Sequence, residues 1–205
     1  MHYGERFNSI SHLVGSALAV IGTVFLLVAG AQAVDPWKIV SFSIYGATLF
    51  FLYLASTLYH SFRGRAKEIW CKFDHCTIYL LIAGSYTPLA LVSLRGAWGW
   101  SLFGVVWGLA LFGIIQEIWL ARGKRILSLI LYVLMGWLAV IAILPLMGTL
   151  GRAGFLWLLA GGLAYTIGII FYVNDTRWRH MHGIWHLFVL AGSACHYVTM
   201  LNYVA

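Results

Sequence analysis

The sequence predicts an all-α membrane protein built as a bundle of seven transmembrane helices. Of its 205 residues, 62% are hydrophobic and only 9% are charged, whereas a soluble domain carries about a quarter charged residues. The charged residues are grouped between long uncharged stretches instead of being spread along the chain. Those stretches are apolar on every side and do not alternate, so they favour membrane-spanning helices over barrel strands.

Seven uncharged stretches are long enough to cross a bilayer. A helix rises ~1.5 Å per residue, so about 20 residues cross a ~30 Å hydrocarbon core. The first stretch is too long for the apolar core of a signal peptide. We expect a single domain over residues 1–205, without a linker, a soluble appendage or the internal repeat that many transporters show. The expected spans are residues 12–33, 38–62, 75–94, 98–118, 126–148, 154–173 and 182–203.

The lysines and arginines predict how the bundle is oriented. With seven spans, the N-terminus and the second, fourth and sixth loops share one face. Because short cytoplasmic loops are enriched in Lys and Arg, the more basic face is predicted to be cytoplasmic and the C-terminus to lie outside, in a multi-pass protein of the cell (inner) membrane. The face with the N-terminus holds ten of the thirteen Lys and Arg residues, namely Arg6, Arg63, Arg65, Lys67, Lys72, Arg122, Lys124, Arg125, Arg177 and Arg179. The opposite face holds three, namely Lys38, Arg95 and Arg152.

The net charge of +7 raises nucleic-acid binding as a competing interpretation. However, the charges form short loop clusters beside apolar spans and not a stripe that lines a groove. Such clusters are suited to anionic lipid headgroups. We therefore expect membrane lipids as partners and no nucleic acid, while protein partners stay unknown.

Polar and ionisable residues gather at one predicted membrane depth. Ser56 and His60 lie one turn apart at the cytoplasmic end of the second span, and Asp74 opens the third. His182 and His186 lie one turn apart at the cytoplasmic start of the seventh. Because ionisable groups near the membrane are costly, such a cluster indicates a functional site.

The spacing of the histidines favours a zinc site. Residues i and i+4 share a helix face, so His182 and His186 offer two imidazoles to one point, and His60 supplies a third if the second span lies near the seventh. Three protein ligands plus water are typical of catalytic zinc. Asp74 would then hold the water and accept its proton, and Ser56 would orient His60 or bind a substrate oxygen.

The competing interpretation is that interfacial histidines are amphipathic anchors, since a single HxxxH motif is weak. The pattern also does not decide whether the metal is zinc, or whether it is catalytic or structural.

Four further polar residues lie near these positions or deeper in the bundle. Glu5, Asn8 and His12 precede or begin the first span, where they form either a polar support beneath the site or the N-terminal cap of the helix. His196 lies ~15 Å deeper than His186, and we expect it to be a buried residue that hydrogen-bonds between helices.

Other histidines and the cysteines are expected to have no chemical role. His75 and His180 flank the cluster and are predicted to be loop or interface residues. Cys71 and Cys76 fall on the reducing cytoplasmic side, and together with Cys195 they are predicted to be small apolar filler.

In these residues the chain resembles the hemolysin III branch of the progestin and adipoQ receptor superfamily, which includes the adiponectin receptors. The resemblance extends over essentially the whole sequence. The matching motifs are Glu5-x-x-Asn8-x-x-Ser11-His12, Ser56-x-x-x-His60, Phe73-Asp74, Gly84-Ser85-Tyr86-Thr87-Pro88, and His182-x-x-x-His186 followed by His196.

The resemblance implies a seven-helix fold with a cytoplasmic N-terminus. It also implies a zinc ion bound by His60, His182 and His186, with a water between the metal and Asp74. The superfamily is similar to alkaline ceramidases, which implies hydrolysis of lipid amides by some members, and bacterial members are associated with membrane lipid homeostasis.

Three functions stay open at this point. The first is a zinc-dependent hydrolase of a lipid acyl amide or ester, in which Asp74 is essential. The second is a sensor or receptor-like regulator in which zinc is structural and Asp74 is dispensable. The third is a channel, transporter or haemolytic pore, which the absence of ionisable residues from the outer halves of the spans and of a lytic segment disfavours.

Overall fold

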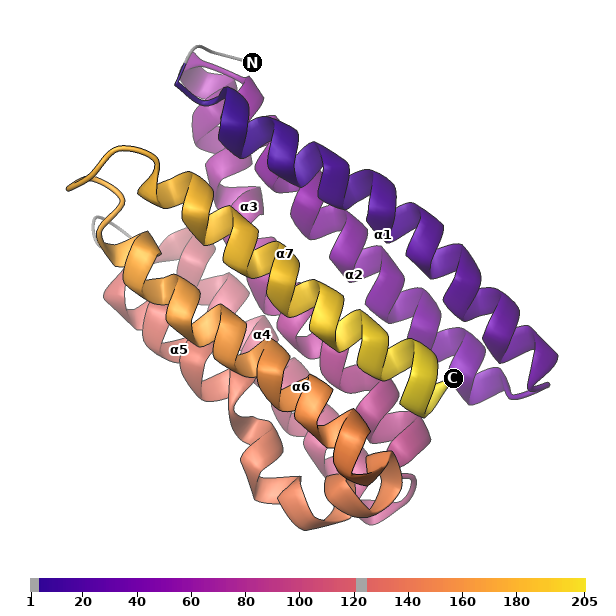
Figure 1. Cartoon of the computed structure of the whole chain (residues 1–205). Helices are drawn as coiled ribbons and strands as arrows, with labels where there is room; N and C mark the ends of the chain where they lie inside the picture. The colour runs from indigo at the N-terminus through magenta and orange to yellow at the C-terminus, as the bar shows by residue number, and fades with distance from the viewer. Residues whose placement is uncertain (1–3, 121–124) are drawn as a thin grey trace.

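The computed structural model describes residues 4–120 and 125–205, and within these ranges the secondary structure is entirely helical. The helices form an elongated bundle, in which α1 begins at one end and the last helix ends at the other (Figure 1). The elements are α1 (Arg6–Gln32), α2 (Pro36–Ser61), α3 (Gly64–Pro88), the π-helix η1 (Leu89–Ser93), α4 (Ala97–Trp119), α5 (Ile126–Gly136), the 3₁₀-helix η2 (Leu138–Ala142), α6 (Ile143–Val173), α7 (Met181–Thr199) and the π-helix η3 (Met200–Val204).

Six helical stretches among the described residues are long and apolar enough to cross a membrane. The fifth, Ile126–Val173, has 48 residues and would extend about 70 Å as one straight helix, far beyond a ~30 Å hydrocarbon core. It is interrupted by η2 and again at Gly151, whose φ of 65° and ψ of 174° are not helical. At this second break, inside the stretch labelled α6, the chain turns back along the bundle (Figure 1), so that Trp137 on one side of Gly151 hydrogen-bonds to Thr166 on the other. The break at Gly151 lies between the predicted spans 126–148 and 154–173.

Helix α3 supplies hydrogen bonds to the backbone where η2 interrupts the fifth stretch. The hydroxyl of Tyr86 donates to the carbonyl of Gly136 at 2.9 Å and accepts the N–H of Ala139 at 2.8 Å. Backbone groups at membrane depth need such internal partners because lipid offers none. In α3 the α-helical register ends at Pro88, because proline has no N–H to donate, and the chain continues as η1.

Helix α3 starts earlier than the third predicted span, already at Gly64. Its charged first turns are rich in Ala, Lys, Glu and Arg, which favour helix although they cannot lie in hydrocarbon. Asp74 therefore lies inside a helix that projects beyond the apolar segment, and not at the first turn of the helix.

Close helix contacts pass through small residues. Helix α2 packs along α1 on one side and α3 on the other, while α6 packs along α7. Gly46 meets the side chain of Thr23, and Gly84 meets Thr48, so the backbones approach closely. In a bilayer such van der Waals packing, and not a hydrophobic driving force, holds helices together.

Gly99, in the first turn of α4, gives a test of this packing. A methyl group there would collide with the backbone carbonyl oxygens of Ala90 and Leu94, whereas one at Gly104 of the same helix would meet no atom within 4 Å. We expect Gly99→Ala to destabilise the protein by about 1–3 kcal/mol, as overpacking does. Gly104→Ala should be neutral or stabilise by up to ~1 kcal/mol. Thermal unfolding in detergent compares them, and equal midpoints would contradict the close approach of η1 and α4.

Candidate metal site

Three histidines meet where α2 ends and α7 begins. His60 lies in the last turn of α2, and His182 and His186 lie in the first two turns of α7. One ring nitrogen of each lies within 4.8 Å of the others, and the group could hold a metal ion. The ring centroids are 5.0, 4.9 and 4.9 Å apart, a nearly equilateral triangle. The fold thus brings together the three residues that the sequence singled out.

The dimensions of this triangle fit zinc. With Zn–N distances of ~2.0–2.1 Å and the ring centre ~1.1 Å beyond the nitrogen, tetrahedral angles separate the ring centroids by about 5 Å. In addition, Nε2 of His60 is buried and has no hydrogen-bond partner among the described residues. A buried nitrogen without a partner is costly, and a metal ion would satisfy it.

The two histidines of α7 each use Nδ1 for an oxygen acceptor. Nδ1 of His182 lies 3.0 Å from a carboxylate oxygen of Asp175, and Nδ1 of His186 lies 3.0 Å from the carbonyl oxygen of Asn8. A carbonyl and an ionised carboxylate only accept, so each Nδ1 carries the proton and each Nε2 keeps its lone pair. Metal-binding histidines are commonly oriented in this way.

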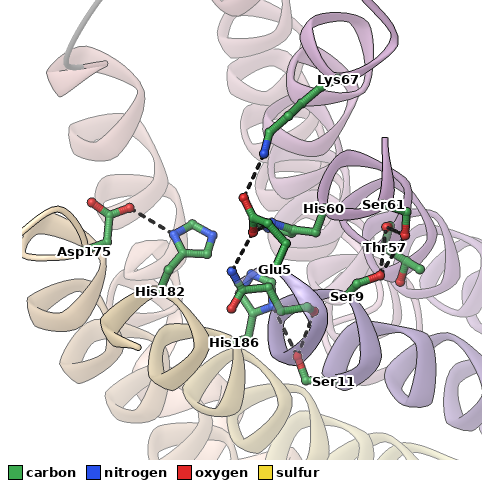
Figure 2. Close-up of polar contacts among 11 residues, drawn as sticks. Glu5, Ser9, Ser11, Thr57, His60, Ser61, Lys67, Asp175, His182 and His186 are labelled. Carbon is green, nitrogen blue, oxygen red and sulfur yellow. Dashed lines mark hydrogen bonds and ion pairs between the residues drawn. The ribbon is translucent and has the colours of Figure 1, made fainter. Parts of the chain in front are cut away.

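Glu5 does the same for His60. One carboxylate oxygen accepts from Nδ1 of His60 at 2.7 Å and from the amide of Asn8 at 2.9 Å, and the other accepts from Nζ of Lys67 at 2.8 Å. Figure 2 shows Glu5 between Lys67 and His60. The hydrogen bond from His60, followed by those from Lys67 and Asn8, outweighs partial burial and holds the pKa of Glu5 well below its ordinary value. Glu5 makes no side-chain cap on α1, so of its two predicted roles the structure has the polar support.

A cavity of about 180 Å³ opens beside the histidines, enough for several waters at ~30 Å³ each. Asp74 and Ser56 both line it, as do His182 and His186. A more apolar cavity of about 130 Å³ adjoins it, since both are lined by Leu52, Ile78, Tyr172, Trp185 and Val189. Polar and apolar spaces therefore meet next to the candidate ligands.

Asp74 differs from the other carboxylates around this cavity. Asp175 is bonded to His182, Glu5 to His60 and Lys67, and the buried Glu117 to Arg125 and Ser128. The side chain of Asp74 has no hydrogen bond or ion pair with any described residue. It is thus the uncommitted carboxylate on the wall of the cavity.

Sequence reasoning missed a second polar group on this wall. His75, predicted to be a loop or interface residue, is buried in α3, because the helix begins at Gly64. Its Nε2 lies 3.1 Å from the guanidinium of Arg125, whose Nε is 2.7 Å from the carboxylate of Glu117. Cys71 was predicted to be filler, yet its sulfur lies 3.6–3.7 Å from the same guanidinium. The i, i+4 spacing of Cys71 and His75 was the available signal.

Of the other residues singled out in the sequence, His196 and His180 do not belong to the three-histidine group. Nε2 of His196 donates to the carbonyl of Leu158 at 3.2 Å, which confirms the expected hydrogen bond between α7 and α6. His180 is exposed in the segment before α7, as a loop residue would be. Arg122 and Lys124, which contribute to the predicted orientation, lie outside the described residues.

Known proteins resemble this chain over almost its whole length. Residues 2–197 match the model of the family described as Haemolysin-III related. The chain is 43% identical to the Hemolysin-3 homolog of Bacillus subtilis (strain 168), over 97% of this chain and 93% of that protein. It is 41% identical to Hemolysin-3 of Bacillus cereus, over 98% and 91%. Monocyte to macrophage differentiation factor of Homo sapiens is 26% identical, over 98% and 85%. The chain belongs to the hemolysin III family of membrane proteins.

Proposed function

We propose that this protein is a zinc-dependent intramembrane hydrolase that cleaves an acyl amide or ester of a lipid and serves membrane lipid homeostasis. One observation carries the proposal. One ring nitrogen from each of His60, His182 and His186 converges with the others beside a cavity whose wall bears the uncommitted carboxylate of Asp74. A site that only held a structural metal would need neither the open polar space nor that carboxylate.

The residues of the chain divide the chemistry between them. His60, His182 and His186 would hold the zinc, which when bound lowers the pKa of water and polarises a carbonyl group. Asp74 orients the attacking water and accepts its proton. Ser56, on the same wall, binds an oxygen of the substrate. The adjoining apolar cavity accepts the acyl chain, which places the scissile bond at the polar end of the bundle.

We also propose that the chain crosses the membrane seven times, with a cytoplasmic N-terminus. The reversal at Gly151 supports counting the 48-residue stretch as two passes. An odd number of passes accords with the first and last helices starting and ending at opposite ends of the bundle. The histidine end also carries Lys67, Arg125 and Arg177, as a cytoplasmic face should.

The orientation can be tested with a reporter fused after Ala205. A reporter that works only outside the cytoplasm should be active there, because the basic residues hold the opposite end inside. The same reporter placed before Glu5 is the matched control and should be inactive. Fluorescence from a cytoplasm-only reporter at Ala205 would overturn the orientation.

The zinc site is tested by elemental analysis and by chelator competition. Purified protein should carry about one zinc per chain, and alanine at any of the three histidines should remove most of it. Glu5→Gln should weaken zinc binding by ~10- to 100-fold, because His60 loses its charged acceptor. Asp35→Asn, which removes a carboxylate at the opposite end of the bundle, should bind zinc like the wild type. A triple histidine variant with undiminished zinc would show that the ligands lie elsewhere.

Replacing Asp74 separates an enzyme from a sensor. We expect Asp74→Asn to retain zinc but to lose ~10²-fold or more in the hydrolysis of a long-chain acyl amide or ester, since it removes the proton acceptor. Turnover of labelled ceramide-like and phospholipid substrates is compared with wild type at matched zinc content. Equal rates would remove Asp74 from catalysis. If wild type cleaves none of a broad lipid panel, the regulator with structural zinc becomes the better account.

A further inference from the structure

His12 lies beside the three histidines but outside their set. It lies in the second turn of α1, and its ring is stacked on that of His186, with centroids 3.7 Å apart and planes 10° apart. The ring of Tyr53 meets it edge-on at 5.0 Å. A ring stacked face to face on a ligand presents its nitrogens to the side, so His12 is not placed to join the other three nitrogens.

The ring nitrogens of His12 have no partner in the described part of the chain, although the side chain is only 3% exposed. A neutral imidazole always carries one N–H donor and one acceptor nitrogen. When both ring nitrogens are buried without a hydrogen bond, the full desolvation penalty of each is incurred, so native structures rarely contain such a histidine. His12 therefore requires a bound molecule with an oxygen atom that can hydrogen-bond to its ring.

The position of that molecule follows from the cavity. His12 lines the same space as Asp74, His182 and His186. Asp74 comes from α3 and the ligand pair from α7, whereas His12 reaches the space from α1. A molecule bound there is thus flanked by the proton acceptor, by the candidate metal ligands and by the N–H of His12.

We propose that His12 is a further catalytic residue that donates its ring N–H to the carbonyl oxygen of the acyl substrate. The proposal rests on the hydrolase function. A neutral donor fixed beside a carbonyl binds the oxygen more strongly as negative charge develops on it, which favours the transition state over the substrate. Tyr53 and His186 hold the ring from two sides, so the donor is in place before the substrate arrives.

Three substitutions separate this donor from its surroundings. His12→Phe keeps a flat ring against His186 and removes both nitrogens. His12→Gln keeps an N–H donor without the stacked ring and serves as the rescue variant. Tyr45→Phe is the matched control, because it removes only a buried hydroxyl of α2 that also has no partner in the described chain, and Tyr45 does not line the cavity.

The decisive measurement is the infrared carbonyl stretch of a long-chain methyl ketone, labelled with ¹³C at its carbonyl, bound to each variant. A ketone cannot be hydrolysed, so the reading does not depend on turnover. It is taken with zinc present and after zinc is stripped with a chelator. We expect a lower frequency in wild type and Tyr45→Phe than in His12→Phe, with or without zinc, and partial recovery in His12→Gln. Equal frequencies in wild type and His12→Phe, or no ketone binding by wild type, would overturn the assignment.

Kinetics at matched zinc content give a second reading. His12→Phe should lose about 10²-fold in kcat with little change in KM, as the removal of one oxyanion donor does. If His12→Phe loses activity only before zinc contents are matched, and equals wild type once they are, His12 acts only by supporting His186. If wild type hydrolyses no lipid but the ketone frequency depends on His12, the hydrolase proposal fails and carbonyl binding by His12 stands.

Discussion

The hydrogen bond between Glu5 and His60 is the contact on which the polar end of the bundle depends. The carboxylate, just before α1, reaches a histidine at the end of α2 and a lysine in α3. The Glu5 carboxylate therefore ties three helices together at one point. Nearby, the hydroxyls of Ser9 and Ser61 hydrogen-bond to each other at 2.7 Å, and the carbonyl oxygen of Asn8 accepts a hydrogen bond from Nδ1 of His186 in α7. Removing the carboxylate would leave an imidazole buried without its acceptor, which costs more than the bond itself contributes.

Away from this end, the bundle is held by a different kind of contact. Its helices approach through glycine and threonine, as at Gly46 and Thr23, and outward-facing side chains such as Leu18, Phe25 and Leu144 are exposed to the surroundings. Packing of this kind tolerates variation in lipid-facing residues. The three converging histidines do not tolerate such variation, because each imidazole needs a hydrogen-bond acceptor that orients its ring. Positional precision is thus concentrated in a few residues at the end where the chemistry is proposed.

The parts of the fold and of the candidate site that depend on interactions within one helix could be predicted from the sequence, whereas the parts that depend on tertiary contacts could not. Charge-free stretches reveal spans because the cost of charge in lipid is local to each helix, and the i, i+4 spacing of His182 and His186 fixes a shared face. His60 joined them through the topology inferred from Lys and Arg. The acceptors Glu5 and Asp175 needed tertiary contacts that no periodicity encodes, since a carboxylate near a helix end is equally suited to capping. The charged residues before residue 75 correctly indicated where the apolar part of α3 begins. The helix itself starts earlier, at Gly64, because those charged residues also favour helix.

The haemolytic activity in the names of related proteins suggests a pore, yet the inner cavities favour hydrocarbon. A conducting path needs polar groups turned toward its lumen. Beyond the histidine site, several polar side chains are instead engaged with the backbone of neighbouring helices, as Tyr86 is with Gly136 and Ala139, and His196 with Leu158. Their use between helices leaves a cavity wall that is mostly apolar. Such a surface has little to offer an ion, but it solvates an acyl chain as well as lipid does. In the proposed hydrolase, the polar end alone would then distinguish one lipid from another, through the linkage that the lipid presents to Asp74 and His12.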